Sequence, residues 1–165
     1  MDRPRQADLD ALIEALVGAG VEFIVIGGAA AVLHGAPTTT WDLDIVHSRT
    51  PENVERLQAL LEELHAVIRD PAGRDVRPTP RHLEGGGQLQ LLTDFGPLDI
   101  LGRLHDGRGY EELLGKSETL GDGSVQIRVI DLPTLIEVKA GAGRAKDRLL
   151  IPILLALNKE RNSDA

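Results

Sequence analysis

The order of apolar and polar positions predicts helices that alternate with strands along most of the chain. Apolar residues recur at helical spacing between Leu9 and Val17, which predicts a helix over residues 7–18. The run 21–26 is rich in β-branched residues and is typical of a buried strand. Polar and apolar residues alternate over 42–46, as they do in a half-exposed strand. Further helices are predicted over 29–34, 51–64, 110–114, 131–140 and 146–160, and further strands over 89–92, 98–101 and 125–130.

The segment 69–87 interrupts this regularity with several prolines and a run of three glycines, so no regular element is predicted there. Its part 69–82 holds four arginines and two aspartates, a mildly basic stretch in an acidic chain. Two interpretations are open, an exposed flexible loop or a surface for an acceptor strand. Since no internal repeat or long linker is present, the chain is predicted to form one α/β (α+β) domain over 1–165. Its core covers 7–130 and a helical part covers 131–160, around a mixed twisted sheet of four to five strands flanked by helices.

Composition narrows the functional classes. The 165 residues suffice for one domain, and 42% hydrophobic residues with only 2% aromatics indicate a core of aliphatic side chains. The absence of cysteine excludes a disulfide framework, a thiolate zinc site and a cysteine nucleophile. The net charge of −8 argues against broad coating of nucleic acid, although a local basic patch could still bind it. Without an apolar run of ~18 residues or a signal-peptide pattern in 1–10, a cytoplasmic protein without membrane contact is expected.

Two carboxylates are the first candidates for chemistry. Asp42 and Asp44 lie two residues apart on a predicted strand, so both side chains point to one face, roughly 7 Å apart along the strand. Such a pair is electrostatically costly unless a cation lies between its members, and hard divalent ions prefer oxygen ligands. The motif by itself also fits a solvated strand edge.

A glycine pair precedes this motif. Gly27 and Gly28 separate the buried strand 21–26 from a helix of small residues. The start of a helix presents unpaired N–H groups, and glycine lets a phosphate approach the backbone. The alternative is a tight turn that needs glycine only for packing. A phosphate-binding turn followed by Asp-x-Asp on the next strand favours the first interpretation.

Residues 23–46 resemble the core of the nucleotidyltransferase superfamily, the polymerase-β-like fold. They resemble most its minimal bacterial branch, which includes the abortive-infection nucleotidyltransferase toxins. That branch has a hydrophobic strand, a glycine pair, a small-residue helix ending in His-Gly, a threonine-rich loop and Asp-hydrophobic-Asp. The matching residues are Ile26-Gly27-Gly28, His34-Gly35, residues 37–40 and Asp42-Leu43-Asp44.

The resemblance extends over most of the chain. It implies that Asp99 is the third carboxylate of the family's site, and the pattern at the helical end matches Lys139, Arg144 and Lys146. Two positions depart from the branch, because Gly28 replaces a frequent serine and Thr38 replaces a frequent arginine.

The resemblance implies a metal-dependent nucleotidyl transfer from a nucleoside triphosphate to a hydroxyl acceptor. The acceptor expected first is RNA, tRNA above all, and then a protein, with a toxin–antitoxin role and a cognate antitoxin as partner. The alternatives are a catalytically silent nucleotide-binding module and a small-molecule transferase of the aminoglycoside-modifying kind. The implied catalytic and metal-binding residues, for two Mg²⁺ or Mn²⁺ ions, are Asp42, Asp44 and Asp99; the implied nucleotide-binding residues are Gly27, Gly28, Thr40, Lys139, Arg144 and Lys146.

Two further residues carry structural expectations. His34, at the end of the predicted helix 29–34, is expected to cap helix carbonyls. Trp41, the single tryptophan, precedes Asp42 and is expected to pack in the core on the opposite face of the sheet.

Overall fold

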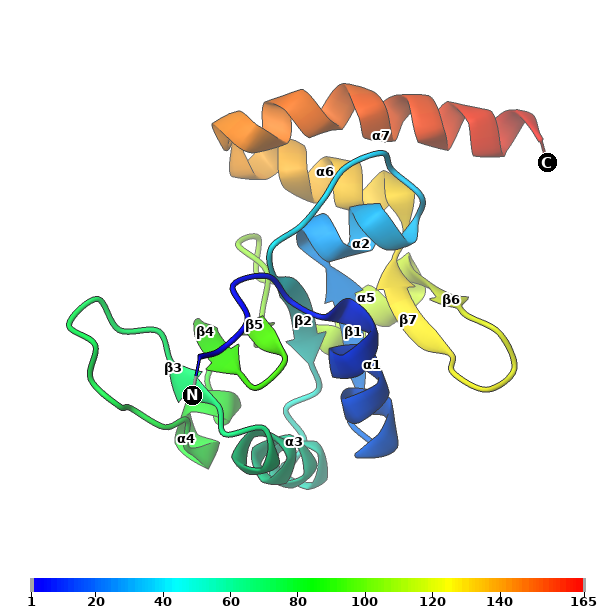
Figure 1. Cartoon of the computed structure of the whole chain (residues 1–165). Helices are drawn as coiled ribbons and strands as arrows, with labels where there is room; N and C mark the ends of the chain where they lie inside the picture. Colours follow the sequence, from blue (N-terminus) through cyan, green and yellow to red (C-terminus); the bar gives the residue numbers. More distant parts are fainter. Residues whose placement is uncertain (1, 165) are drawn as a thin grey trace.

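The chain forms a mixed sheet with helices around it in a computed structural model that describes residues 2–164 (Figure 1). The strands are β1 (Phe23–Ile26), β2 (Leu43–His47), β3 (Val67–Ile68), β4 (Gln88–Thr93), β5 (Gly96–Leu101), β6 (Ser117–Leu120) and β7 (Ile127–Ile130). The helices are α1 (Leu9–Gly18), α2 (Gly27–Leu33), α3 (Pro51–Glu63), α4 (Pro80–Glu84), α5 (Tyr110–Leu113), α6 (Leu132–Ala142) and α7 (Ala145–Ser163), with a 3-10 turn η1 (Leu114–Lys116). The strand order is β3-β4-β5-β2-β1-β7-β6, so the two segments that carry Asp44 and Asp99 lie next to each other in the middle of the sheet.

The α/β class and the helix-flanked mixed sheet are confirmed, but the sheet has seven strands rather than four to five. The two strands that the sequence did not reveal, β3 and β6, are the edges of the sheet. β3 has two residues, too few for a periodic signal, and the polar residues of β6 resemble those of a loop. Edge strands need only one paired side, so short and polar segments suffice there.

The prediction that 69–87 holds no regular element is wrong at α4 (Pro80–Glu84). Proline is tolerated in the first turn of a helix because the N–H that it lacks has no partner within the helix. The backbone N–H of Thr79 donates to Nδ1 of His82 at 2.9 Å, which closes the turn at its start.

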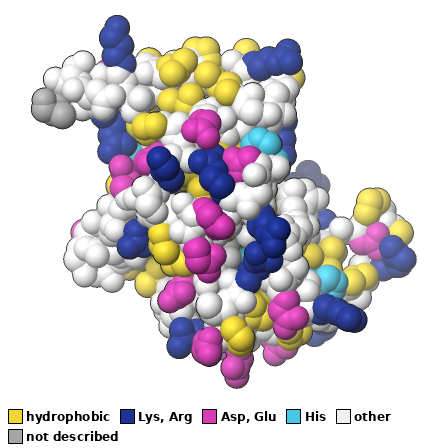
Figure 2. All heavy atoms as spheres, turned by 180° about the vertical axis from the view of Figure 1, so that it is seen from behind, with side chains coloured by type: hydrophobic (Ala, Val, Ile, Leu, Met, Phe, Trp, Pro, Cys, Tyr) yellow, Lys and Arg dark blue, Asp and Glu magenta, His cyan; other side chains and the backbone are white. Residues whose placement is uncertain are grey.

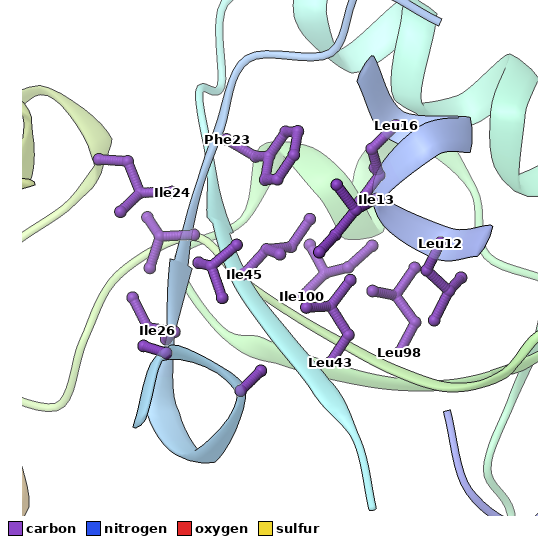
Figure 3. Close-up of a cluster of buried hydrophobic side chains, with 14 of the residues drawn as sticks. Leu12, Ile13, Leu16, Phe23, Ile24, Ile26, Leu43, Ile45, Leu98 and Ile100 are labelled. Atoms are coloured by element: carbon purple, nitrogen blue, oxygen red, sulfur yellow. The ribbon is translucent and has the colours of Figure 1, made fainter. Parts of the chain in front are cut away.

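A large part of the core lies between α1 and one face of the sheet (Figure 3). It is mainly aliphatic, as the composition predicts, and side chains from α1, β2 and β5 meet in it: Leu12, Ile13, Leu16, Leu43, Ile45, Leu98 and Ile100. Since successive strand residues point to opposite faces, burying these positions turns Asp44 and Asp99 to the other face.

α2, α6 and α7 lie together beyond one end of the central strands (Figure 1). α6 ends at Gly143, whose φ of +65° is the left-handed conformation that glycine adopts readily. His34 ends α2, where its backbone N–H donates to the Ala30 carbonyl oxygen, but its side chain does not cap the helix. Its Nε2 bonds to the Ile130 carbonyl oxygen at 2.7 Å, and its Nδ1 accepts from Arg161 at 3.0 Å, so it links α2 to β7 and α7.

On the face seen in Figure 2, Lys and Arg side chains alternate with Asp and Glu rather than forming one basic patch. Arg74 forms an ion pair with Asp70 of the same segment. The expected core position of Trp41 is wrong, because its side chain is 64% exposed where the chain enters β2. None of the helices in residues 2–164 is long and apolar enough to span a membrane.

Candidate active site

Three carboxylates from two neighbouring strands converge on one face of the sheet. β2 pairs with β5 in parallel, and the register sets Asp44 directly beside Asp99. Asp42 precedes β2 by one residue and points to the same side as Asp44. One oxygen from each of Asp42, Asp44 and Asp99 lies within 4.8 Å of the others. The structure therefore brings together the carboxylates that the sequence analysis singled out.

Gly27 leaves room for one of these carboxylates. Ile26 pairs with Asp44 across β1 and β2, so the turn into α2 begins beside the Asp44 side chain. A Cβ at Gly27 would lie 2.4 Å from Oδ2 of Asp44, and φ of Gly27 is +64°. Both the contact and the backbone conformation require glycine.

The space beside Gly28 is filled by Thr40. A Cβ at Gly28 would lie 3.0 Å from Oγ1 of Thr40, and that hydroxyl donates to the Asp42 carbonyl oxygen at 3.0 Å. A serine at position 28 would therefore require Thr40 to shift. The glycine that departs from the family pattern is thus matched by a neighbouring hydroxyl that also holds the backbone of Asp42.

These residues border a pocket of about 750 Å³ between the sheet and the α6–α7 hairpin. Both glycines and all three carboxylates line it. Of the other nucleotide-binding candidates, Lys139, Arg144 and Lys146 line the pocket, whereas Thr40 lies behind Gly28 and does not.

The three basic candidates differ in their environment. Lys139 is 8% exposed and donates to Oδ1 of Asp147 at 3.0 Å, which joins α6 to α7 beside the pocket. Removing one member of such a buried pair leaves the other charge uncompensated. Arg144, just before α7, and Lys146, in the first turn of α7, are exposed where a bound phosphate could meet them.

Burial and mutual repulsion change the acidity of the cluster. The pKa of Asp44 is raised to about 7, first by burial and then by the charges of Asp99 and Asp42. Burial also raises the pKa of Asp99, an effect that the positive charge of Arg69 opposes. At neutral pH the cluster thus lacks enough positive charge to keep all its carboxylates ionised.

Arg69 is a site residue that the sequence analysis treated only as part of a basic loop. Its Nη2 donates to Oδ1 of Asp99 at 2.6 Å and lies 3.6 Å from Oδ2 of Asp42. The backbone N–H of Arg69 donates to the Gln90 carbonyl oxygen, which extends the pairing of β3 with β4 by one residue. Only the pairing of this very short strand brings Arg69 toward Asp99, so no local pattern could have identified it.

Further polar residues that the sequence analysis missed line the β4–β5 side of the pocket. Gln88 donates to Oδ2 of Asp99 at 3.4 Å. Gln90, Arg103 and His105 also border the pocket, and all three are exposed. The positions of Gln88 and Gln90 depend on the antiparallel pairing of β4 with β5, which a reading of single segments does not supply.

The donor set fits a divalent cation. Magnesium and calcium bind carboxylate oxygens at about 2.0–2.6 Å, so two ligands of one ion can be up to about 5 Å apart. The mutual spacing of at most 4.8 Å among the three oxygens is within that limit. Burial and the negative charges of Asp99 and Asp42 raise the pKa of Asp44, and a bound cation would offset both effects by stabilising the charged form.

The metal-free protein is expected to become less stable as the pH rises through 7. Below that pH the folded state holds a proton on Asp44 that the unfolded chain, with an ordinary aspartate pKa of about 3.9, has lost. The contribution of the raised pKa to stability is full below the unfolded pKa, falls as the pH rises between the two values, and is gone above the folded pKa of about 7. In EDTA, calorimetry should give a higher Tm at pH 6 than at pH 8. Asp44→Asn should remove most of this difference, and an unchanged difference in the variant would contradict the assignment.

Comparison with known sequences gives a partial match to one larger protein. No protein-family model matches the chain. Over 134 residues, 76% of the chain, it is 31% identical to glycosyltransferase AglE of Haloferax volcanii. The chain spans only 41% of the length of that relative, so the match says nothing of most of the larger protein.

Solved structures give a fuller match. The lincosamide antibiotic adenylyltransferase LnuA, bound to lincomycin, superposes with a TM-score of 0.64 at 14% identity, over 93% of this chain and 99% of that one. An antigenic nucleotidyltransferase-like protein from Paracoccidioides brasiliensis superposes with a TM-score of 0.57 at 16% identity, over 92% and 77% of the two chains. The chain therefore has the nucleotidyltransferase fold expected from its sequence. Membership of the abortive-infection branch stays a prediction.

Proposed function

We propose that this protein is a metal-dependent nucleotidyltransferase that moves a nucleoside monophosphate from a nucleoside triphosphate to a hydroxyl acceptor. The observation that carries the proposal is the convergence of Asp42, Asp44 and Asp99 within 4.8 Å beside the glycine turn of a nucleotidyltransferase fold. The pocket around them also carries exposed basic side chains, as an anionic substrate requires.

Each residue has a distinct proposed role. Asp42 and Asp44 would hold two Mg²⁺ or Mn²⁺ ions, and Asp99 would complete the ligand set on the acceptor side. When bound, such ions screen phosphate charge and lower the pKa of a hydroxyl. The backbone at Gly27 and Gly28 would face the β- and γ-phosphates.

Several side chains would complete the substrate site. Arg144 and Lys146 would contact the phosphates from the α6–α7 turn, while Lys139 is held at the pocket wall by Asp147. Thr40 would act indirectly, by supporting Asp42. In the transfer, the acceptor oxygen forms a bond to the α-phosphorus, the bond to pyrophosphate breaks with its electron pair, and a carboxylate takes the acceptor proton.

For the acceptor we propose RNA, with tRNA first, or a protein side chain, in a toxin–antitoxin setting with a cognate antitoxin. Arg103 and His105 support an anionic acceptor, because both border the pocket and are exposed. Lys139 and Arg74 offer little free positive charge to such an acceptor, since both are paired with carboxylates. A small-molecule acceptor remains an alternative, as does a silent nucleotide-binding module. The neighbour LnuA is an antibiotic adenylyltransferase, but likeness of fold does not carry its acceptor to this chain.

Glycosyl transfer is a second candidate, favoured by the match to AglE. Nucleotide sugars also contain a diphosphate that carboxylate-bound metal ions could hold. The coverage of 93% of this chain by a nucleotidyltransferase-fold structure makes it the weaker candidate.

The decisive experiment follows a label. The protein is incubated with Mg²⁺, cellular RNA and protein, and nucleoside triphosphates labelled at the α-phosphate. Nucleotidyl transfer moves that label into the acceptor, whereas glycosyl transfer moves only a label placed in the sugar of a nucleotide sugar. Label on small molecules alone would support the small-molecule alternative, and nucleotide binding without any transfer would support the silent module.

Mg²⁺ or Mn²⁺ is expected to stabilise the folded protein, and more so with a nucleoside triphosphate present. A ligand that binds only the native state at 100 times its Kd adds about 2.7 kcal/mol, and a domain of this size gains about 2–4 °C in Tm per kcal/mol. Thermal denaturation at millimolar Mg²⁺ with nucleotide should therefore show a rise of roughly 5–10 °C. Asp42→Asn should lose most of the shift, and an unchanged Tm in the wild type would contradict a metal–nucleotide site.

A further inference from the structure

The side chain of Arg69 reaches into the carboxylate cluster from a segment outside the motifs of the site. Its Nη2 donates to Oδ1 of Asp99 at 2.6 Å and lies 3.6 Å from Oδ2 of Asp42. The Asp99 side chain is only 4% exposed, whereas that of Arg69 is 31% exposed. The guanidinium therefore enters from the solvent side and ends against a buried oxygen.

The contacts of Arg69 with Asp99 and Asp42 occupy carboxylate oxygens that a metal ion would need as ligands. Among the described residues, Arg69 alone forms ion pairs with this cluster, to Asp99 and to Asp42. A charge-assisted hydrogen bond of this length is among the strong ones. A guanidinium and a divalent ion would also repel each other at such distances.

The way in which Arg69 is held allows its side chain to leave the carboxylate cluster. The pairing of β3 with β4 ends at Arg69, whose N–H bonds to the Gln90 carbonyl oxygen. Residues 71–77, which follow Asp70, are exposed. Within the side chain, Nε is buried and has no hydrogen-bond partner, so only one end of the guanidinium is held. Withdrawing the side chain breaks the contacts with Asp99 and Asp42 and leaves the sheet intact.

We infer that Arg69 is a resident counter-cation that competes with divalent metal for Asp99 and Asp42, so that metal entry requires Arg69 to withdraw. The inference rests on the proposed function and concerns the regulation of that same site. In the resting protein Arg69 neutralises part of the cluster and sets the metal concentration at which the site loads. The inference predicts that removing the charge of Arg69 has two opposite effects. It lowers the stability of the metal-free fold and raises the affinity of the site for metal.

Arg69→Gln tests the inference through Mn²⁺ binding, measured by isothermal titration calorimetry without nucleotide. Removing the competitor should tighten Mn²⁺ binding by about tenfold, within the usual range of coupling between ligands that share a site. In EDTA the variant should have a lower Tm than the wild type, and the gap should close with excess Mn²⁺. Arg69→Lys keeps the charge without the planar fork and should give an intermediate affinity.

Arg74→Gln is the matched control, because Arg74 lies on the same segment but pairs with Asp70 outside the cluster. It should leave Mn²⁺ affinity unchanged. Equal or weaker Mn²⁺ binding by folded Arg69→Gln would overturn the inference. Failure of both the wild type and Arg69→Gln to bind Mn²⁺ would refute the metal site of the proposed function itself, a distinct result.

Discussion

Replacing Asp44 with asparagine is expected to lower nucleotidyl transfer by about 1000-fold or more, because the loss of metal-ion catalysis is worth several kcal/mol and each 1.36 kcal/mol is tenfold in rate. The same substitution should raise the Tm of the metal-free protein at pH 8. Burial and the neighbouring carboxylates raise the pKa of Asp44 to about 7, so its charged form is disfavoured in the fold. Asparagine carries no charge and avoids this cost. Label transfer and calorimetry in EDTA measure the two effects on one preparation.

A fall in transfer activity together with a rise in the metal-free Tm distinguishes a functional carboxylate from a structural one. Asp122→Asn is the control, since Asp122 lies on an exposed turn where it bonds to Ser124, and it should retain full transfer activity. If Asp44→Asn lost activity and metal-free stability together, Asp44 would be a structural residue and the proposed assignment would fail.

Gly27→Ala is expected to destabilise the fold by about 3 kcal/mol or more, because a non-glycine residue in the left-handed region costs about 1–2 kcal/mol and overpacking adds about 1–3 kcal/mol. The steric part is direct, since the new Cβ would lie 2.4 Å from Oδ2 of Asp44. Relieving that contact must move either the turn into α2 or the Asp44 carboxylate. Metal-dependent stabilisation should therefore fall along with the Tm, as denaturation with and without Mg²⁺ would show.

Gly123→Ala serves as the matched control. Gly123 has no atom within 4 Å of an added Cβ, and its φ lies outside the left-handed region. This variant should unfold within about 0.5 kcal/mol of the wild type, as do most surface substitutions. Wild-type stability and metal response in Gly27→Ala would contradict the packing of Asp44 against the turn.

The local elements follow from periodicity and turn chemistry within short stretches of sequence. α3 is an example, because Thr50 accepts from the Asn53 N–H at the start of the helix and Pro51 occupies its first position. Strands with a buried face, such as β2 and β5, are recognisable for the same reason, since the period of two is a local property. β3, β6 and α4 escaped this reasoning because they are very short or mostly polar.

Some residues of the candidate site can be identified from local sequence, and others cannot. Local sequence is enough to predict that Asp42 and Asp44 share a face and that glycine opens α2, because two-residue periodicity and the freedom of φ at glycine are local. Asp99 could be selected only by its resemblance to a family position, and what sets it beside Asp44 is the parallel register of β2 and β5. That register joins segments more than fifty residues apart.

The remaining features of the site depend on how the elements pack together. The contact of Arg69 with Asp99 depends on the pairing of β3 with β4, and the pairing of Lys139 with Asp147 depends on how α6 packs on α7. Trp41 is exposed although the alternation along its strand predicted a core position, because β2 begins only at Leu43 and Trp41 lies before the strand. The sequence thus determines which residues can share a face of one element, whereas ion pairs between elements depend on register and packing, which only the folded chain defines.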